Sequence, residues 1–180
     1  MASLVDRMIR AAKLDVSLYE EVEADKSALG QAAIVVLLSS IAAGIGSVDQ
    51  LGAGGIVTTA LLSLVAWVIW AFLTYIIGTK LLPTPETKTD LGEMMRTIGF
   101  ASSPGVLNVL GVIPFVGQFV ALIVGIWGFI AMVIAVRQAL DYTSTWRAVG
   151  VCAIGFVVYI IIAVVLAGVI GTEHMAPSAS

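Results

Sequence analysis

The feature that most constrains this chain is a series of apolar runs, each near the length of a membrane-spanning helix. The runs lie at 28–48, 55–77, 97–113, 115–136 and 148–171. A helix needs about 20 mainly apolar residues to cross a hydrocarbon core about 30 Å thick. The sequence therefore predicts an all-α polytopic membrane protein with five transmembrane helices.

The composition indicates that lipid is part of the solvent of this protein. Of its 180 residues, 59% are hydrophobic and 12% are charged, whereas ordinary soluble domains carry about 25% charged residues. The net charge of -3 argues against a nucleic-acid partner. Cys152, the only cysteine, lies in an apolar run, which argues against an internal disulfide and a thiolate metal cluster. We expect no cofactor and no metal.

The positions of the basic residues predict the orientation in the membrane. All of them fall on one side of a five-span chain: Arg7, Arg10, Lys13, Lys26, Lys80, Lys88, Arg96, Arg137 and Arg147. Cytoplasmic loops carry such an excess of Lys and Arg. We therefore expect a cytoplasmic N-terminus and a C-terminus outside. Because all the basic residues fall on one side only if there are five spans, their placement favours five spans over four or six.

Residues 1–27 are predicted to form a cytoplasmic amphipathic segment. Apolar residues recur at helical spacing (Leu4, Val5, Met8, Ile9, Ala12 and Val16), and Arg7, Arg10 and Lys13 occupy the other face. This pattern fits a helix in the membrane interface whose bases meet lipid headgroups. A helix packed on the protein's own cytoplasmic loops is an equal alternative. Ser3 and Ser17 are predicted N-caps, because each precedes an acid by three residues.

The third apolar run contains a predicted break. Pro104 lacks a backbone N–H and crowds the carbonyl four residues earlier, so a kink near Ser102 is expected. The hydroxyls of Ser102 and Ser103 are suited to satisfy the freed carbonyls. Ser102, Ser103, Pro104 and Gly105, with Asn108, form the candidate hinge or partner site. The alternative is a static kink that only shapes the bundle.

Two stripes of small residues and two arginines complete the set of candidate residues. The stripes are Gly117, Ala121 and Gly125 in the fourth run and Ala163 and Ala167 in the fifth, at a spacing that lets helices approach closely. Arg96 and Arg137 lie at the cytoplasmic ends of runs and are expected to extend to the interface. Binding of a lipid headgroup or a partner is their alternative role.

The usual catalytic patterns are not found in the sequence. His174, the only histidine, lies in the predicted disordered tail at 172–180, so there is no HExxH motif, and there is no phosphate-loop motif. No acid or base lies in the middle of a predicted span, where carriers of ions usually place one. These observations weaken the enzyme and transporter interpretations.

Residues 93–127 carry a resemblance to a known family. Arg96 lies near a helix start and is followed by Phe-Ala-Ser-x-Pro, which ends at Pro104. An Ile-Pro-x-x-Gly turn at 113–117 and an apolar helix reaching Ile126-Trp127-Gly128 come next. This order resembles the Yip family of Ypt/Rab-interacting membrane proteins. The resemblance extends over about 14–171.

The resemblance implies a role in membranes. Eukaryotic members of that family are implicated in vesicle traffic, membrane shaping and binding of prenylated Rab-type GTPases. Their long cytoplasmic N-terminal region corresponds here to about thirty residues, which argues against GTPase binding and for a prokaryotic-type member in the cytoplasmic membrane. We expect a five-span membrane domain at 28–171 in a non-enzymatic protein that organises membrane lipids or a membrane-protein partner, or forms a homo-oligomer. The alternative is a permease or channel for a small solute.

Overall fold

The structure is a computed structural model that describes residues 2–113 and 115–173. Within its helices, side chains are not described at 49–51, 53, 163 and 166–173. Pro114 of the predicted turn, and the predicted tail from residue 174 onward, lie outside the described residues.

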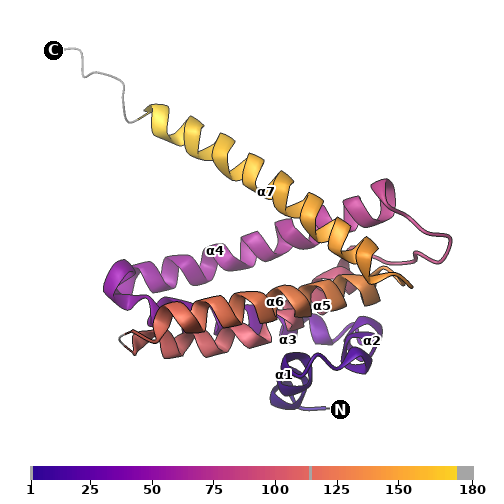
Figure 1. The fold of residues 1–180 in the computed structure, drawn as a ribbon, viewed down its shortest axis with the longest axis horizontal. Helices are drawn as coiled ribbons and strands as arrows, with labels where there is room; N and C mark the ends of the chain where they lie inside the picture. Colours follow the sequence, from indigo (N-terminus) through magenta and orange to yellow (C-terminus); the bar gives the residue numbers. More distant parts are fainter. Residues whose placement is uncertain (1, 114, 174–180) are drawn as a thin grey trace.

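The described chain is helical throughout its ordered elements, as the sequence predicts (Figure 1). In chain order these are α1 (Leu4–Ala12), α2 (Val16–Ala24), α3 (Ala28–Gly46), α4 (Val48–Ile76), the π-helical turn η1 (Ile77–Leu81), α5 (Leu91–Ala101), the 3₁₀ helix η2 (Ser103–Val112), α6 (Gly117–Ala139) and α7 (Thr145–Glu173). Near its start, α4 contains Gly52 with φ of 63°, where two helices join across a kink.

The N-terminal helices begin at short polar side chains. Ser3 accepts a hydrogen bond from the backbone N–H of Asp6 at 3.1 Å, so the predicted cap of α1 is confirmed. The predicted cap at Ser17 is wrong, because Asp15 caps α2 by accepting from the N–H of Ser17 at 3.0 Å. A carboxylate caps a helix as well as a hydroxyl does, and Asp15 is already extended at the position before the helix.

Among the described residues, four helices are long and apolar enough to cross a membrane. They cover Ala28–Gly46, Gly54–Leu81, Gly117–Ala139 and Thr145–Ile162. The remaining apolar run, 97–113, is divided between α5 and η2, and neither reaches the length of a span alone. Asp90 and Glu93 form the predicted capping box at the start of α5. The described structure therefore supports a polytopic membrane protein, with the third run in two parts.

The composite of α5 and η2 packs in parallel along α3. A Cβ atom placed on Gly99 would lie 2.7 Å from Cβ of Ala32, and one on Gly105 would lie 3.0 Å from Cβ of Ser39. At the far end, a Cβ on Gly46 would lie 2.0 Å from the carbonyl oxygen of Asn108. Contacts thus advance along both segments in the same direction. The backbones approach this closely because glycine has no side chain at the contact points.

A periodicity of three explains why η2 presents small residues to α3. A 3₁₀ helix has three residues per turn, so Ser102, Gly105, Asn108 and Gly111 fall on one face. On the α-helical partner, two turns correspond to about seven residues, which is the spacing of Ala32, Ser39 and Gly46. Residues of the two stripes stay opposite one another along the contact, because each stripe repeats with the period of its own type of helix.

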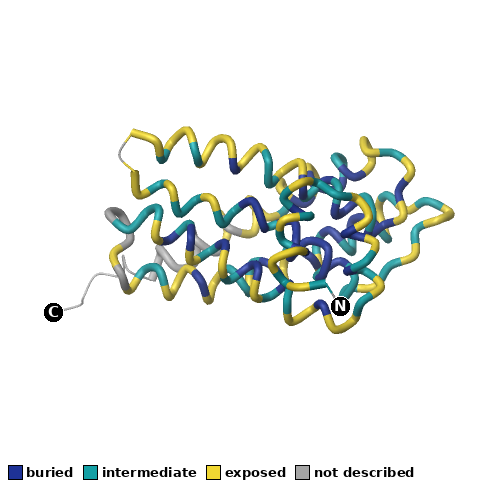
Figure 2. Tube along the Cα trace, turned by 90° about the horizontal axis from the view of Figure 1, so that it is seen from below, coloured by how far each residue is buried: buried dark blue, intermediate teal, exposed yellow. Residues whose placement is uncertain are grey.

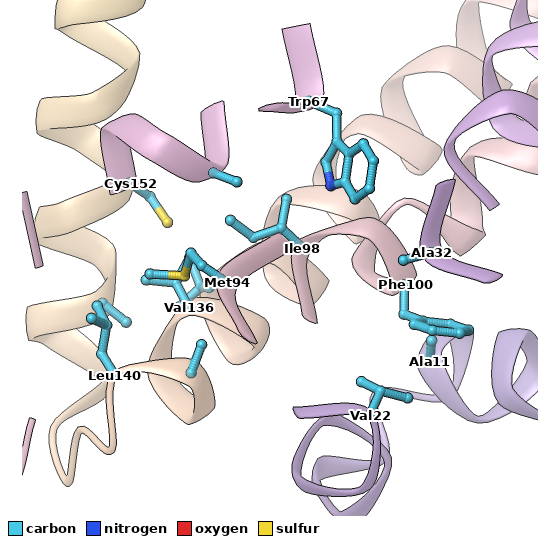
Figure 3. Packing of buried hydrophobic residues seen from close by; sticks show 14 of the residues in the cluster. Ala11, Val22, Ala32, Trp67, Met94, Ile98, Phe100, Val136, Leu140 and Cys152 are labelled. Carbon is cyan, nitrogen blue, oxygen red and sulfur yellow. The ribbon is translucent and has the colours of Figure 1, made fainter. Parts of the chain in front are cut away.

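The buried core lies at the end of the molecule where α1 and α2 pack (Figure 2). Met94, Ile98 and Phe100 of α5 are at its centre, with Val22 of α2 and Val136 of α6 beside them (Figure 3). Toward the opposite end, α4, α6 and α7 expose large apolar side chains such as Leu61, Phe119 and Ile160. In a membrane protein these exposed surfaces face lipid.

We expect Gly46→Ala to lower thermal stability. The added Cβ would meet a backbone oxygen of η2, and overpacking of this kind costs about 1–3 kcal/mol. The matched control is Gly30→Ala in the same helix, where an added Cβ meets nothing within 4 Å. The melting temperatures of the two purified variants in detergent measure their stabilities. Equal melting temperatures for Gly46→Ala and the wild type would contradict the close contact of α3 with η2.

Candidate functional site

The candidate site begins at the junction of α5 and η2. The hydroxyl of Ser103 donates to the carbonyl of Phe100 at 2.7 Å. That carbonyl is the one that would have received the N–H of residue 104 in an α-helix, and proline has none. The expected compensation by a serine hydroxyl is therefore confirmed for Ser103. The hydroxyl of Ser102 lies 3.5 Å from the carbonyl of Ile98, a long distance that makes it a weak contact.

The junction is also held from outside by α3. The carbonyl of Ser102 accepts from the hydroxyl of Ser39 at 2.7 Å and from the N–H of Gly105 at 2.8 Å. Ser103 and Pro104 are buried. Ser39 was not among the residues predicted from the sequence, and its seven-residue spacing from Ala32 and Gly46 is the signal that identifies it. The backbone carbonyls of Phe100 and Ser102, on either side of the break, thus both accept hydrogen bonds. The role of the break as a hinge or partner site stays a prediction.

Beside this junction lies a groove of about 1370 Å³, which we call the central groove. Residues of α3, α4, α5, η2, α6 and α7 line it. Its small lining residues include Ser39, Gly46 and Gly105, while Trp67 and Trp70 of α4 contribute aromatic surface. Three members of the predicted hinge site, Ser102, Gly105 and Asn108, are also lining residues. The structure thus brings this predicted site to the wall of a groove.

The small-residue stripe of α6 lines the central groove as well. A Cβ on Gly117 would lie 2.9 Å from the carbonyl oxygen of Gly111, so this position packs on the end of η2. Ala121 and Gly125 are exposed, and a Cβ on Gly125 would meet nothing within 4 Å. Contact of this face with another chain stays a prediction. The side chains of Ala163 and Ala167, in the second predicted stripe, lie outside the described residues.

At the cytoplasmic end predicted from the sequence, the bases of α1 face α2. Arg7 is only 4% exposed and contacts Glu21 at 2.9 Å, Asp25 at 2.8 Å and the side-chain oxygen of Gln31 at 3.0 Å. Arg10 pairs with Asp15 at 2.8 Å and also with Glu21. The predicted basic face open to headgroups is thus corrected for these two arginines, because acids of α2 occupy it. Lys13 is exposed at the end of α1.

These ion pairs change the proton affinity of the acids. Hydrogen bonds from Arg10, and then from Arg7, lower the pKa of Glu21 against the opposing effect of burial. The hydroxyl of Ser27, followed by Arg7, lowers the pKa of Asp25 to about 2. Both acids are therefore charged at neutral pH and hold α1 against α2.

Arg96 joins α5 to α2. Its side chain is 4% exposed, and its Nε donates to the carbonyl of Val22 at 2.8 Å while Nη2 donates to the carbonyl of Glu23. These carbonyls belong to the last turn of α2, which has no intrahelical donors for them. Arg96 therefore caps α2 instead of extending freely to headgroups, which corrects its predicted position.

Two further contacts attach the N-terminal segment to α6. The indole Nε1 of Trp127 donates to the carbonyl of Ala12 at 2.8 Å, and the amide of Gln138 donates to Glu20 at 3.1 Å. Arg137, the other predicted headgroup residue, is half-buried and donates through Nε to the carbonyl of Tyr142 at 3.1 Å. We name α1 and α2, with these attachments, the N-terminal cap.

Between the N-terminal cap and the α6–α7 connection lies a hollow of about 590 Å³. Glu20, Glu23, Glu93 and Asp141 line it with Arg137. Burial, and then the charges of Asp141 and Glu93, raise the pKa of Glu23 to about 7. Among the described residues, no group of three or more His, Cys, Asp or Glu side chains is arranged to hold a metal ion.

These features define a helical membrane protein with a cap fixed to one end of its helices and a lateral groove between them. Its sequence matches the family profile described as the Yip1 domain over residues 17–166. The protein belongs to the Yip1 domain family, which confirms the resemblance seen at residues 93–127. No curated protein and no solved structure matches the chain.

A double-mutant cycle tests the compensation at Pro104. Ser103→Ala leaves the buried carbonyl of Phe100 without its side-chain donor, and we expect a loss of about 1–3 kcal/mol. Pro104→Ala supplies a backbone N–H four residues after that carbonyl, so the double variant should lose less than Ser103→Ala alone. Ser40→Ala is the control, because Ser40 donates at 2.8 Å to the carbonyl of Val36 within an unbroken helix. If the stability losses of the two single variants simply added in the double variant, the replacement of the Ser103 hydroxyl by a backbone N–H would be contradicted. Melting in detergent measures these losses.

Proposed function

We propose that this protein is a five-span, non-enzymatic membrane protein that organises the membrane or a membrane-protein partner through its cytoplasmic cap. The observation that carries the proposal is the N-terminal cap, tied to three parts of the helical bundle by Arg7, Arg96 and Trp127. A segment fixed in this way presents a surface of constant shape. Such a surface serves recognition, because little ordering entropy is lost on binding.

The length of α5 and η2 together supports five spans. The 11 residues of α5 rise about 16 Å and the 10 residues of η2 about 20 Å, because a 3₁₀ helix rises about 2 Å per residue. Their sum exceeds a hydrocarbon core of about 30 Å. Parallel packing of α5–η2 on α3 also supports it, since α4 must return across the membrane between them. With the bases at 7–26, 80–96 and 137–147, the N-terminus is cytoplasmic and the C-terminus is outside.

The exposed surface of the cap supports the partner role. Val5 is 64% exposed and Ile9 is 48% exposed, one helical turn apart on α1, while the arginines of that helix point into the cap. A fixed apolar ridge at the inner membrane surface suits contact with a membrane-protein partner or with the lipid interface. A homo-oligomer stays a prediction.

A photo-crosslinking amino acid at position 9 tests this function in native membranes. We expect discrete protein or lipid adducts from Ile9, because its side chain is exposed on the ridge. The matched control is the same amino acid at Asp6, an exposed polar position of the same helix. Equal labelling at both positions would contradict a contact through the ridge. Flux of a small solute through vesicles that contain the purified protein would favour a permease instead.

A further inference from the structure

Much of the central groove is lined by apolar and aromatic side chains. The part of the groove beside the buried core is lined by Val36, Ile98 and Met132, together with Trp67 and Trp70. Both indole N–H groups are already engaged: Trp67 donates to the carbonyl of Met95 at 3.1 Å, and Trp70 to the sulfur of Met132 at 3.4 Å. This part of the groove therefore offers an apolar surface to an occupant.

The other end of the groove carries polar side chains with hydrogen-bonding capacity. Ser47 follows the end of α3, Asn108 lies in the last half of η2, and Gln118 is in the first turn of α6. These three side chains make no hydrogen bond with another described residue. Because α3 and η2 run in parallel and α6 begins where η2 ends, the three positions share one end of the bundle. None of the described residues that line the groove is charged.

The rim of the groove is apolar and open to the side. Phe119 of α6 is 69% exposed and Phe156 of α7 is 58% exposed, and both line the groove. Because the groove opens at the side of the bundle, the acyl chains of a surrounding lipid reach it directly and adapt to its irregular walls.

We propose that the central groove binds a membrane phospholipid with a zwitterionic headgroup. Its acyl chains lie against Trp67, Trp70 and Ile98, and its headgroup phosphate accepts hydrogen bonds from the side chains of Ser47, Asn108 and Gln118. The lack of charge among the lining residues selects against an anionic headgroup, which would need a basic partner. The assignment of this lipid to the outer leaflet rests on the five-span orientation proposed above. Binding itself does not depend on that orientation.

Retention of dioleoylphosphatidylcholine by the full-length protein tests the proposal. The lipid is added to delipidated protein in mild detergent, and native mass spectrometry measures the lipid-bound fraction. Gly125→Phe fills the groove, because Gly125 lines it and an added Cβ has free space. We expect an affinity about tenfold lower, as one obstructed site would give. Leu122→Phe is the matched control, since Leu122 is exposed on the same helix and does not line the groove.

The outcomes separate the proposal from its alternatives. Equal retention by Gly125→Phe and Leu122→Phe would overturn the lipid site, as would equal retention of dioleoylphosphatidylglycerol by the wild type. A wild-type dimer that only Gly125→Phe dissociates would identify a second copy as the occupant and would also overturn it. Ala121→Phe replaces Gly125→Phe if that variant melts at a lower temperature. Since the measurement is made in detergent, a wrong membrane orientation leaves its result unchanged.

Discussion

The backbone of the third apolar run must satisfy its hydrogen bonds although Pro104 interrupts it. Unpaired backbone groups cost several kcal/mol in a hydrocarbon medium, so the segment needs both a replacement donor and a regular continuation. Ser103 supplies the donor, and the 3₁₀ geometry of η2 supplies the continuation. That geometry also decides which residues meet α3. At Gly105 and Gly111 the two segments approach so closely that an added Cβ would lie about 3 Å from Ser39 or Gly46.

The two ends of the molecule differ in how far their side chains are buried. At the end of the N-terminal cap, a core of buried residues forms, Arg7 pairs with acids and Arg96 donates to backbone carbonyls. At the other end, α4, α6 and α7 keep fewer neighbours and leave the central groove between them. The cap therefore determines the positions of the helices at its own end, and the other end exposes more apolar surface.

The helix content and four of the apolar spans followed from the sequence, because lipid demands long apolar helices. The caps at Ser3 and Asp90 followed as well, since they depend on local spacing. The pairing of Arg7 and Arg10 with acids did not, because a helical wheel of residues 1–16 contains no information on α2. The stripe at Ser102, Gly105, Asn108 and Gly111 was missed, because a period of three is meaningful only once a 3₁₀ helix is assumed. Five spans and the orientation remain predictions from charge placement and segment length.

A disulfide cross-link between α3 and η2 tests the central claim, that the third apolar run is a composite helix packed in parallel on α3. The pair Ser39→Cys and Gly105→Cys, introduced with Cys152→Ala, should oxidise in native membranes, because the Cβ positions lie 3.0 Å apart and a small shift reaches disulfide geometry. The pair Ala32→Cys and Gly105→Cys should not, since Ala32 lies two turns, about 10 Å, further along α3. Equal cross-linking of both pairs, or cross-linking of the second alone, would contradict the register.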